Sequence, residues 1–292
     1  MSGMILSVFS MFDYFAVKFR GRMGNQLFQA AFLYSQNNRS RLKGIFLAEK
    51  AFVLDTYFNY PWYFSLVNGF RSIVFRLIFR GSFYKPLVQS AEMQEKLFAA
   101  RGITYQGFFQ STFYFDRDLI LNSLAFKVRQ RVKHNFEGKF RDLLRSKLLT
   151  VHVRRSDYRE LRKKELNFVE ATLPMDYYSH ALQKLGSASD QVLILTDDLT
   201  EVKELLPIEN ARYMSNHFME DFLLMQYSPK LIISNSTFSW WAAFLNTVPD
   251  VRVIAPKYFL GYNAGVEYPR GIEEGTGWEW IHHEPKEFRK EN

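Results

Sequence analysis

Short apolar runs alternate with amphipathic stretches along the second half of the chain. Apolar runs of this length are typical of strands that a parallel sheet buries on both faces. The amphipathic stretches repeat apolar residues every three or four positions, as helices do. We therefore predict strands over Leu148–Val153, Val192–Leu195, Leu231–Ser234 and Val251–Ile254, and helices over Phe140–Leu148, Met175–Leu185, Thr200–Leu206, Glu220–Tyr227 and Trp240–Leu245.

The first half of the chain is aromatic, basic and less regular. Its pattern predicts a strand over Phe15–Phe19, a helix over Asn25–Ser35 and a strand over Ile103–Phe109. Strands that alternate with helices indicate parallel pairing and an α/β fold with a doubly wound sheet. We expect two domains, formed by residues 1–148 and 149–292.

Two apolar stretches bear on membrane contact. Met4–Phe19 is interrupted by Asp13 and has neither a preceding basic stretch nor a small-residue cleavage site, so it does not predict a signal peptide. Tyr60–Lys85 carries scattered basic residues, which fits either an amphipathic helix on an anionic membrane or a core-packed helix with its arginines in solvent. No run reaches the roughly 18 uncharged apolar residues of a spanning helix. We expect a cytoplasmic protein, with peripheral contact at the inner face of the membrane as the alternative.

Composition narrows the choice of partners. A net charge of +8 favours an anionic partner, which is a nucleic acid, a nucleotide-bearing substrate or an acidic membrane. The basic residues are scattered and form no RNA-binding pattern, so we expect no nucleic acid. The absence of cysteine excludes disulfides, thiolate metal sites and a cysteine nucleophile.

The first of three polar motifs is G-R-M-G-N-Q at Gly21–Gln26, between a predicted strand and a predicted helix. Glycines there permit positive φ and close approach of a ligand to the backbone, and helix amides can meet negative charge. The motif matches neither the dinucleotide fingerprint nor the P-loop. Without further context, an ordinary tight turn explains it equally well.

The second motif, H-V-R-R-S-D at His152–Asp157, directly follows a predicted strand. Ligands bind at this edge of parallel sheets. Arg154 and Arg155 can grip phosphate through charge-assisted hydrogen bonds, and Asp157 can accept a proton from an attacking hydroxyl. A loop-stabilising Arg–Asp pair is the alternative. We favour function because charged groups at the exit of a buried strand cost desolvation energy.

The third motif lies within Ile232–Phe244, where an apolar strand ends in the polar cluster N-S-T and a helix follows. Free amides at such a helix start form an anion site. We expect Trp240 and Trp241 to pack in the core. The natural N-cap residues are Ser236, Thr237 and Ser239.

Motifs of metal chemistry are missing. The chain has no zinc-ligand spacing and no D-x-D of the kind that chelates a metal-bound nucleotide diphosphate. The paired carboxylates of Thr196–Asp198 could hold a metal, but we predict an aspartate N-cap for the following helix. A leaving diphosphate would then be stabilised by arginines and helix amides, and we predict neither a metal nor another cofactor.

In this order and separation the three motifs resemble those of the α-1,2-fucosyltransferases of glycosyltransferase family 11. The family pattern is G-R-x-G-N-Q, then H-x-R-R-x-D, then N-S-[ST]-F-S-W-W. Weaker similarities lie at Gly107–Tyr114, Leu195–Leu199 and Val253–Lys257. One departure is Ser156, where the family usually has glycine; if that position needs positive φ, serine strains the loop by roughly 1 kcal/mol.

The resemblance implies a GT-B-like fold, in which two doubly wound α/β domains face a central cleft and the second domain holds GDP-fucose. It implies that Arg154 contacts the β-phosphate of this donor, while His152 and Arg155 line the nucleotide pocket. Asp157 is the implied general base.

The other two motifs receive roles by the same resemblance. The residues expected to hold the diphosphate are Asn235, Ser236, Thr237, Ser239 and Trp240, the last through its amide. Arg22 and Asn25, with Gly24 beside them, are expected to reach across the cleft to fucose and the leaving phosphate.

The implied activity is inverting, metal-independent transfer of L-fucose from GDP-fucose to the 2-hydroxyl of a terminal β-galactoside, in surface glycan (O-antigen) biosynthesis. The acceptor would be a galactose-terminated oligosaccharide, and a lipid-linked one if Tyr60–Lys85 touches the membrane. Two alternatives stay open. One is a transferase for another GDP-sugar or another acceptor hydroxyl, and the other is a non-catalytic protein that binds nucleotide sugars or glycolipids.

Overall fold

The structure is a computed structural model that describes residues 14–48, 53–59, 84–86, 99–161 and 170–282. The chain divides into two compact units, residues 1–129 and 130–292. The predicted boundary lies after helix α6 (Gln130–Leu144), whereas the structure divides the chain before it. Helix α6 belongs to the second unit because it packs on helix α9 (Phe218–Gln226) and the residue after it. Phe136 contacts the Tyr227 ring at 5.4 Å between centroids, and the Tyr227 hydroxyl donates to Glu137 at 2.5 Å.

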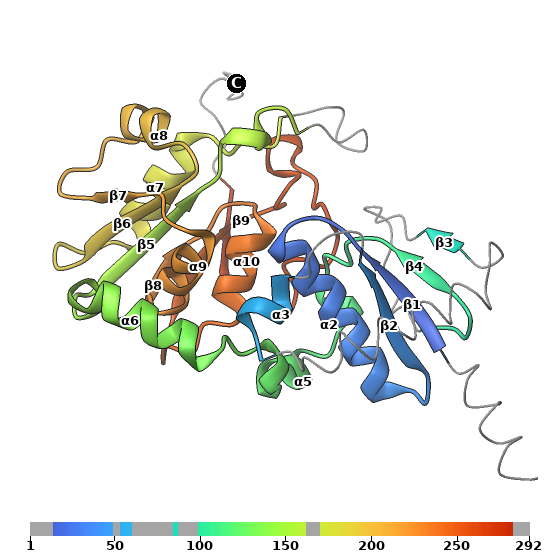
Figure 1. Cartoon of the computed structure of the whole chain (residues 1–292). Coiled ribbons are helices and arrows are strands. Elements are labelled where there is room, and N and C mark those ends of the chain that lie inside the picture. The colour runs from blue at the N-terminus through green and yellow to red at the C-terminus, as the bar shows by residue number, and fades with distance from the viewer. Residues whose placement is uncertain (1–13, 49–52, 60–83, 87–98, 162–169, 283–292) are drawn as a thin grey trace, which may run out of the picture. The chain divides into compact units, whose positions relative to one another are not determined.

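The first unit contains a four-stranded parallel sheet in the order β2-β1-β4-β3. Helix α2 joins β1 to β2 and packs against both (Figure 1). Aromatic rings fill the space under α2, where Phe32 stacks on Phe109 at 4.2 Å and meets Phe15 edge-on. The elements are β1 (Tyr14–Phe19), α2 (Met23–Arg39), β2 (Lys43–Ala48), α3 (Val53–Tyr57), β3 (Tyr84–Pro86), β4 (Thr104–Gln106) and α5 (Arg117–Asn122).

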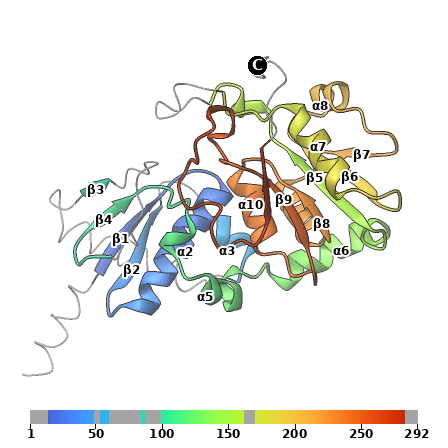
Figure 2. The same ribbon diagram turned by 180° about the vertical axis from the view of Figure 1, so that it is seen from behind.

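The second unit contains a six-stranded parallel sheet in the order β10-β9-β8-β5-β6-β7 (Figure 2). Its strands are β5 (Leu148–Val153), β6 (Gln191–Thr196), β7 (Arg212–Met214), β8 (Lys230–Ile232), β9 (Arg252–Pro256) and β10 (Glu279–Ile281). The chain runs outward from β5 to β7, returns to place β8 beside β5, and then runs outward the other way. This strand order is that of the doubly wound dinucleotide-binding fold, and the direction reverses between β5 and β8.

The remaining helices of the second unit are α7 (Met175–Leu185), α8 (Leu199–Leu205) and α10 (Thr237–Phe244), besides α6 and α9. Helix α7 packs on β8 and β9. Its buried Tyr177 donates a hydrogen bond to the Ile233 carbonyl at 2.7 Å, directly after β8. The α7 side chains thus fix the backbone at the point where β8 ends.

The predicted α/β class with parallel sheets is confirmed, and β5 and α7 have the predicted bounds. Helix α6 differs, since it begins at Gln130 and not at Phe140. Its first half is mostly polar, with Val132 and Phe136 as its apolar residues, and Phe140 itself has non-helical torsion angles (φ −108°, ψ 17°). Helix α10 begins at Thr237, three residues before the predicted Trp240, because Ser236 caps it.

Several elements were not predicted, among them β2, α3, α5 and the three-residue strands β3, β7 and β10. Short edge strands carry too few residues for a periodic signal. Residues 60–83 of the Tyr60–Lys85 stretch lie outside the described residues, and Tyr84 and Lys85 belong to β3. Within the described ranges, no helix has the length and apolarity needed to cross a bilayer.

Replacing Tyr177 by phenylalanine tests the anchoring of β8. The variant leaves the Ile233 carbonyl buried without its partner, so we expect the free energy of unfolding to fall by about 1–3 kcal/mol in urea denaturation. Tyr34→Phe is the control, because the Tyr34 ring contacts Phe126 while its hydroxyl has no hydrogen bond in the described part of the chain. A Tyr177→Phe variant as stable as wild type would contradict the anchoring role.

Candidate active site

The ends of β5 and β8 bring two of the predicted motifs together. In the parallel pair, Val151 lies beside Ile232, so both strands leave the sheet at the same edge. His152 Nδ1 lies 2.8 Å from Ser234 Oγ and links the two strand ends. Burial, aided by the positive charge of Arg154, lowers the pKa of His152 to about 3. The imidazole is therefore neutral at physiological pH and acts as a hydrogen-bonding group.

Arg154 lies between two carboxylates. Its Nη2 donates to Asp157 at 2.5 Å and its Nη1 lies 2.9 Å from Asp197, which follows the neighbouring strand β6. Its guanidinium also lies over the Tyr158 ring at 5.6 Å, and its buried Nε has no hydrogen-bond partner. An arginine shared in this way can transfer to a bound phosphate, since the guanidinium forms fork-shaped contacts with either anion.

Arg155 is directed toward α8 and away from Arg154's carboxylates. Its Nε and Nη2 donate to Glu201 at 3.0 and 2.8 Å, and Nη1 donates to the Leu173 carbonyl at 3.3 Å. Arg159 completes the cluster by contacting Glu201 and Asp198. These contacts bind the Arg155 guanidinium to the loop and to α8, which the sequence did not indicate.

Asp197 and Asp198 have separate tasks. Asp198 is the N-cap of α8 and accepts from the Glu201 amide at 3.1 Å, as predicted. Asp197 accepts from the Arg155 amide at 2.8 Å in addition to holding Arg154.

Ser156 begins a short 3₁₀ turn and is not among the residues with positive φ, so the departure from glycine causes no backbone strain there.

The start of α10 contributes fewer exposed groups than the motif suggested. The Ser236 side chain caps the helix by accepting from the Phe238 amide. The Ser239 hydroxyl is fully buried and donates within the turn, and the Trp240 amide donates to the Ser236 carbonyl at 2.9 Å. Thr237, which begins the helix, is only partly buried. Two of the groups predicted to hold a diphosphate here, the Ser239 hydroxyl and the Trp240 amide, thus donate to the Ser236 carbonyl at the start of the helix.

Asn235 precedes this cap and is almost fully buried. Its Nδ2 donates to the Ala171 carbonyl at 2.7 Å, while its Oδ1 has no hydrogen-bond partner. The Trp240 and Trp241 side chains lie in the core, as predicted, and stack edge-on with each other. The Asn235 oxygen is therefore an acceptor next to the two strand ends that the protein itself leaves unused.

The first motif, Gly21–Gln26, belongs to the first unit. Helix α2 begins at Met23, and Arg22 is its exposed N-cap residue, with no side-chain cap. Gly21 has φ +82°, so the predicted glycine turn is confirmed. Gly24 is buried in the first helical turn, and Asn25 follows it. The structure thus gathers the second and third motifs of the sequence in one unit and sets the first motif in the other.

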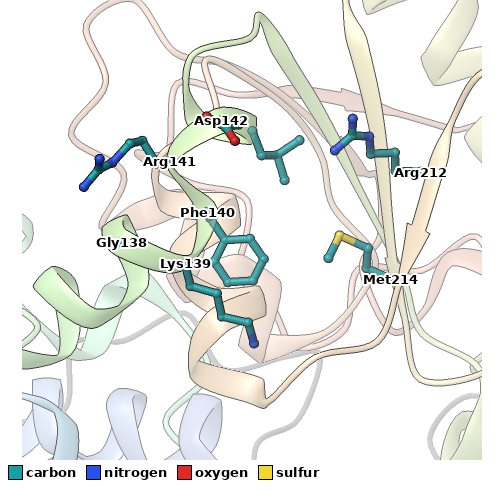
Figure 3. A pocket seen from close by; sticks show the side chains of 8 residues that line it. Gly138, Lys139, Phe140, Arg141, Asp142, Arg212 and Met214 are labelled. Atoms are coloured by element: carbon teal, nitrogen blue, oxygen red, sulfur yellow. The ribbon is translucent and has the colours of Figure 1, made fainter.

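A separate pocket of about 570 Å³ lies in the second unit between α6 and β7 (Figure 3). Phe140 and Met214 face each other across it. It is lined by Gly138, Lys139, Phe140, Arg141, Asp142, Leu143, Arg212 and Met214. None of the predicted site residues lines this pocket. The candidate site is therefore the group of polar and charged side chains at the ends of β5 and β8.

The sequence contains one D-x-D triplet, at Asp116–Asp118. Asp116 is the N-cap of α5, where it accepts from the Leu119 amide at 3.1 Å and pairs with Arg39 at 3.2 Å. These contacts give it a structural role. Among the described residues no three His, Asp or Glu side chains are grouped as a metal site requires, and metal independence stays a prediction.

The Glu201 cluster predicts a pH effect on stability. Hydrogen bonds from Arg155, with those from Arg159, lower the Glu201 pKa from its ordinary 4.5 to about 2. A lowered pKa stabilises the folded state above pH 4.5, and this contribution is lost as the pH falls toward 2. We expect Glu201→Gln to lower the melting temperature at pH 6 and the difference from wild type to shrink below pH 4.5.

Glu204→Gln is the matched control, because Glu204 lies exposed on the same helix. The difference between this variant and wild type should stay small at every pH. A gap between wild type and Glu201→Gln that does not change with pH would contradict the ion-pair role.

Comparisons with known proteins show what this chain resembles in sequence and in fold. The O-antigen biosynthesis glycosyltransferase WbnK of Escherichia coli is 31% identical over 122 residues, which cover 39% of this chain and 40% of that protein. The match therefore spans less than half of the relative.

A crystal structure of the α-1,6-fucosyltransferase NodZ co-crystallized with GDP matches with a TM-score of 0.50 and 14% identity, over 83% of this chain and 94% of that one. A second structure, of NodZ from Bradyrhizobium, matches with a TM-score of 0.49 and 15% identity, over 83% of this chain and 94% of that one. The first likeness confirms the GT-B-like fold class.

The family model "Glycosyl transferase family 11" matches residues 88–264, which is more than half of the chain. The matched region contains the second and third motifs and ends before the last strand. The protein therefore belongs to glycosyl transferase family 11.

Proposed function

We propose that the protein transfers L-fucose from GDP-fucose to the 2-hydroxyl of a terminal β-galactoside, with inversion and without a metal, in O-antigen assembly. Family membership supports glycosyl transfer, and the relative with 31% identity is an O-antigen glycosyltransferase by name. The fold is like that of a fucosyltransferase co-crystallized with GDP. The observation that carries the proposal is Arg154 at the reversal point of the sheet, shared between Asp157 and Asp197.

In this proposal the donor diphosphate competes for Arg154. The guanidinium turns part of its hydrogen bonding from the carboxylates to the β-phosphate, and Thr237 at the start of α10 supports the same phosphate. Asp197 keeps its hydrogen bond to the Arg155 amide, which holds the loop while Arg154 moves. The loop after β5 and the start of α10 are then held in place by Arg155, Ser239 and Trp240. His152 contributes a neutral hydrogen-bonding ring.

The reaction is a single displacement. The galactose O2 forms a bond to fucose C1 while the bond from C1 to the β-phosphate oxygen breaks, and GDP leaves with the electron pair. Asp157, released by Arg154, takes the proton of the attacking hydroxyl. Negative charge grows on the phosphate as the bond breaks, so Arg154 with Arg22 and Asn25 of the first unit stabilises the transition state more than the ground state.

The defining experiment is an incubation with GDP-fucose and a panel of β-galactosides, free and lipid-linked, followed by linkage analysis of the product. We expect an α-1,2 linkage and full activity in the presence of EDTA. Transfer from another GDP-sugar, or to another hydroxyl, would replace this proposal by the related transferase. Protein that binds GDP-fucose and releases no GDP with any acceptor would be a non-catalytic binder.

Arg154→Ala should lower kcat by roughly 10³-fold, because it removes the main donor to the leaving phosphate. Arg212→Ala is the matched control, since Arg212 is an exposed arginine of the same unit with no ion pair in the described residues. The control should keep wild-type turnover. An Arg154→Ala variant that is folded and nearly as active as wild type would refute the donor assignment.

A further inference from the structure

Amide side chains of α2 join the loops of the first unit. Gln29 is fully buried; it accepts from the Arg20 amide at 3.1 Å and donates to the Gly107 carbonyl at 2.9 Å. These two backbone groups fix which end of the Gln29 amide faces which loop, because a backbone N–H only donates and a carbonyl only accepts. Since β1 and β4 are parallel neighbours (Figure 1), the loops after them lie at one edge of the sheet. The Gln29 hydrogen bonds connect these two loops.

The loop after β4 contacts α2 a second time through Gln110. Its Nε2 donates to Asn25 Oδ1 at 2.7 Å, and Gln110 itself is buried. The other end of the Asn25 amide faces the Gly21 turn: a Cβ on Gly21 would lie 2.5 Å from Asn25 Nδ2. The Asn25 oxygen is thus turned toward the β4 loop and its NH₂ group toward the turn that carries Arg22.

A strained residue holds Gln110 in this place. Phe109 precedes it and has φ +54°, a left-handed conformation that is strained for a bulky residue. Its fully buried ring stacks on Phe32 and meets Tyr114 edge-on at 5.7 Å, and this packing offsets the strain. The backbone therefore turns at Phe109 in a way that sets the Gln110 side chain against Asn25.

We propose that Gln110 is a positioning residue that sets the polarity of Asn25, so that Asn25 presents hydrogen-bond donors to the leaving phosphate. A phosphate oxygen accepts hydrogen bonds, and an asparagine turned the other way would face it with its own oxygen. This inference rests on the proposed role of Asn25 in fucosyl transfer. It makes the loop Gly107–Ser111 part of the site, although that loop holds no group of the donor motifs.

Gln110→Glu tests the proposal with a nearly isosteric change. The introduced carboxylate cannot donate, so Asn25 must rotate its amide to donate to it and present its oxygen to the phosphate. We expect kcat to fall about 30-fold, as for the loss of one hydrogen bond to a charged group. Gln110→Met removes the hydrogen bond without reversing Asn25 and should lower kcat less than Gln110→Glu does.

A double-mutant cycle separates this role from a purely structural one. If Gln110 acts through Asn25, Gln110→Glu causes no further loss of kcat in an Asn25→Ala background. Gln36→Met is the matched control. Gln36 lies on the same helix, ten residues after Gln26, and its side chain accepts a hydrogen bond from the Ala99 amide at 3.0 Å. This substitution should lower the melting temperature and leave kcat unchanged.

The outcomes distinguish the two proposals. Wild-type protein that transfers no fucose to any acceptor overturns the proposed function, and this inference with it. An active wild type combined with a fully active Gln110→Glu variant overturns the inference alone. Losses that add in the double variant also overturn it, because they show that Gln110 acts independently of Asn25.

Discussion

The candidate donor site depends on the parallel pairing of β5 with β8. Both strands are buried, and their register sets Val151 beside Ile232, so the chain leaves the sheet twice at one edge. The winding direction of the sheet reverses between these strands, and ligands of doubly wound sheets bind at such a reversal point. The His152–Ser234 hydrogen bond joins the two strand ends, and Tyr177 holds the backbone after β8 from the other side. All later features of the site, including the position of Arg154, follow from this pairing.

Charge balance governs the groups at that edge. Three arginines and four carboxylates form a connected cluster in which Arg155 and Arg159 are matched by Glu201 and Asp198, while Arg154 is shared by Asp157 and Asp197. The matched pairs hold the loop, and Arg155 binds Glu201 with two nitrogens of its planar guanidinium. The shared arginine satisfies two carboxylates at once and leaves its Nε unused. In the proposed function the diphosphate adds negative charge and competes with Asp157 and Asp197 for Arg154, which would couple donor binding to the release of Asp157.

In the first unit, neutral amide side chains hold the loops in place through hydrogen bonds to the backbone. Gln26 and Gln29 each donate to one loop carbonyl and accept from one backbone amide, which a charged side chain cannot do. The turn around Gly21 is held in this way by the neutral amide of Gln26. The two units thus use different chemistry to hold their loops, ionic in one and amide in the other.

The sequence by itself determined the elements and motifs whose signal is local. The buried strand β5, the amphipathic helix α7 and the caps Asp198 and Ser236 follow from periodicity and capping preferences, and the glycine turn at Gly21 follows from its conformational freedom. Only the tertiary structure decided which motif residues face each other. The Arg155–Glu201 pair, the burial of Ser239 and the contact between Gln110 and Asn25 join positions that no local pattern links, the last across 85 residues of chain. Hydrophobic periodicity encodes which face a residue occupies within its own element, whereas strand order and packing decide the partner that meets it there.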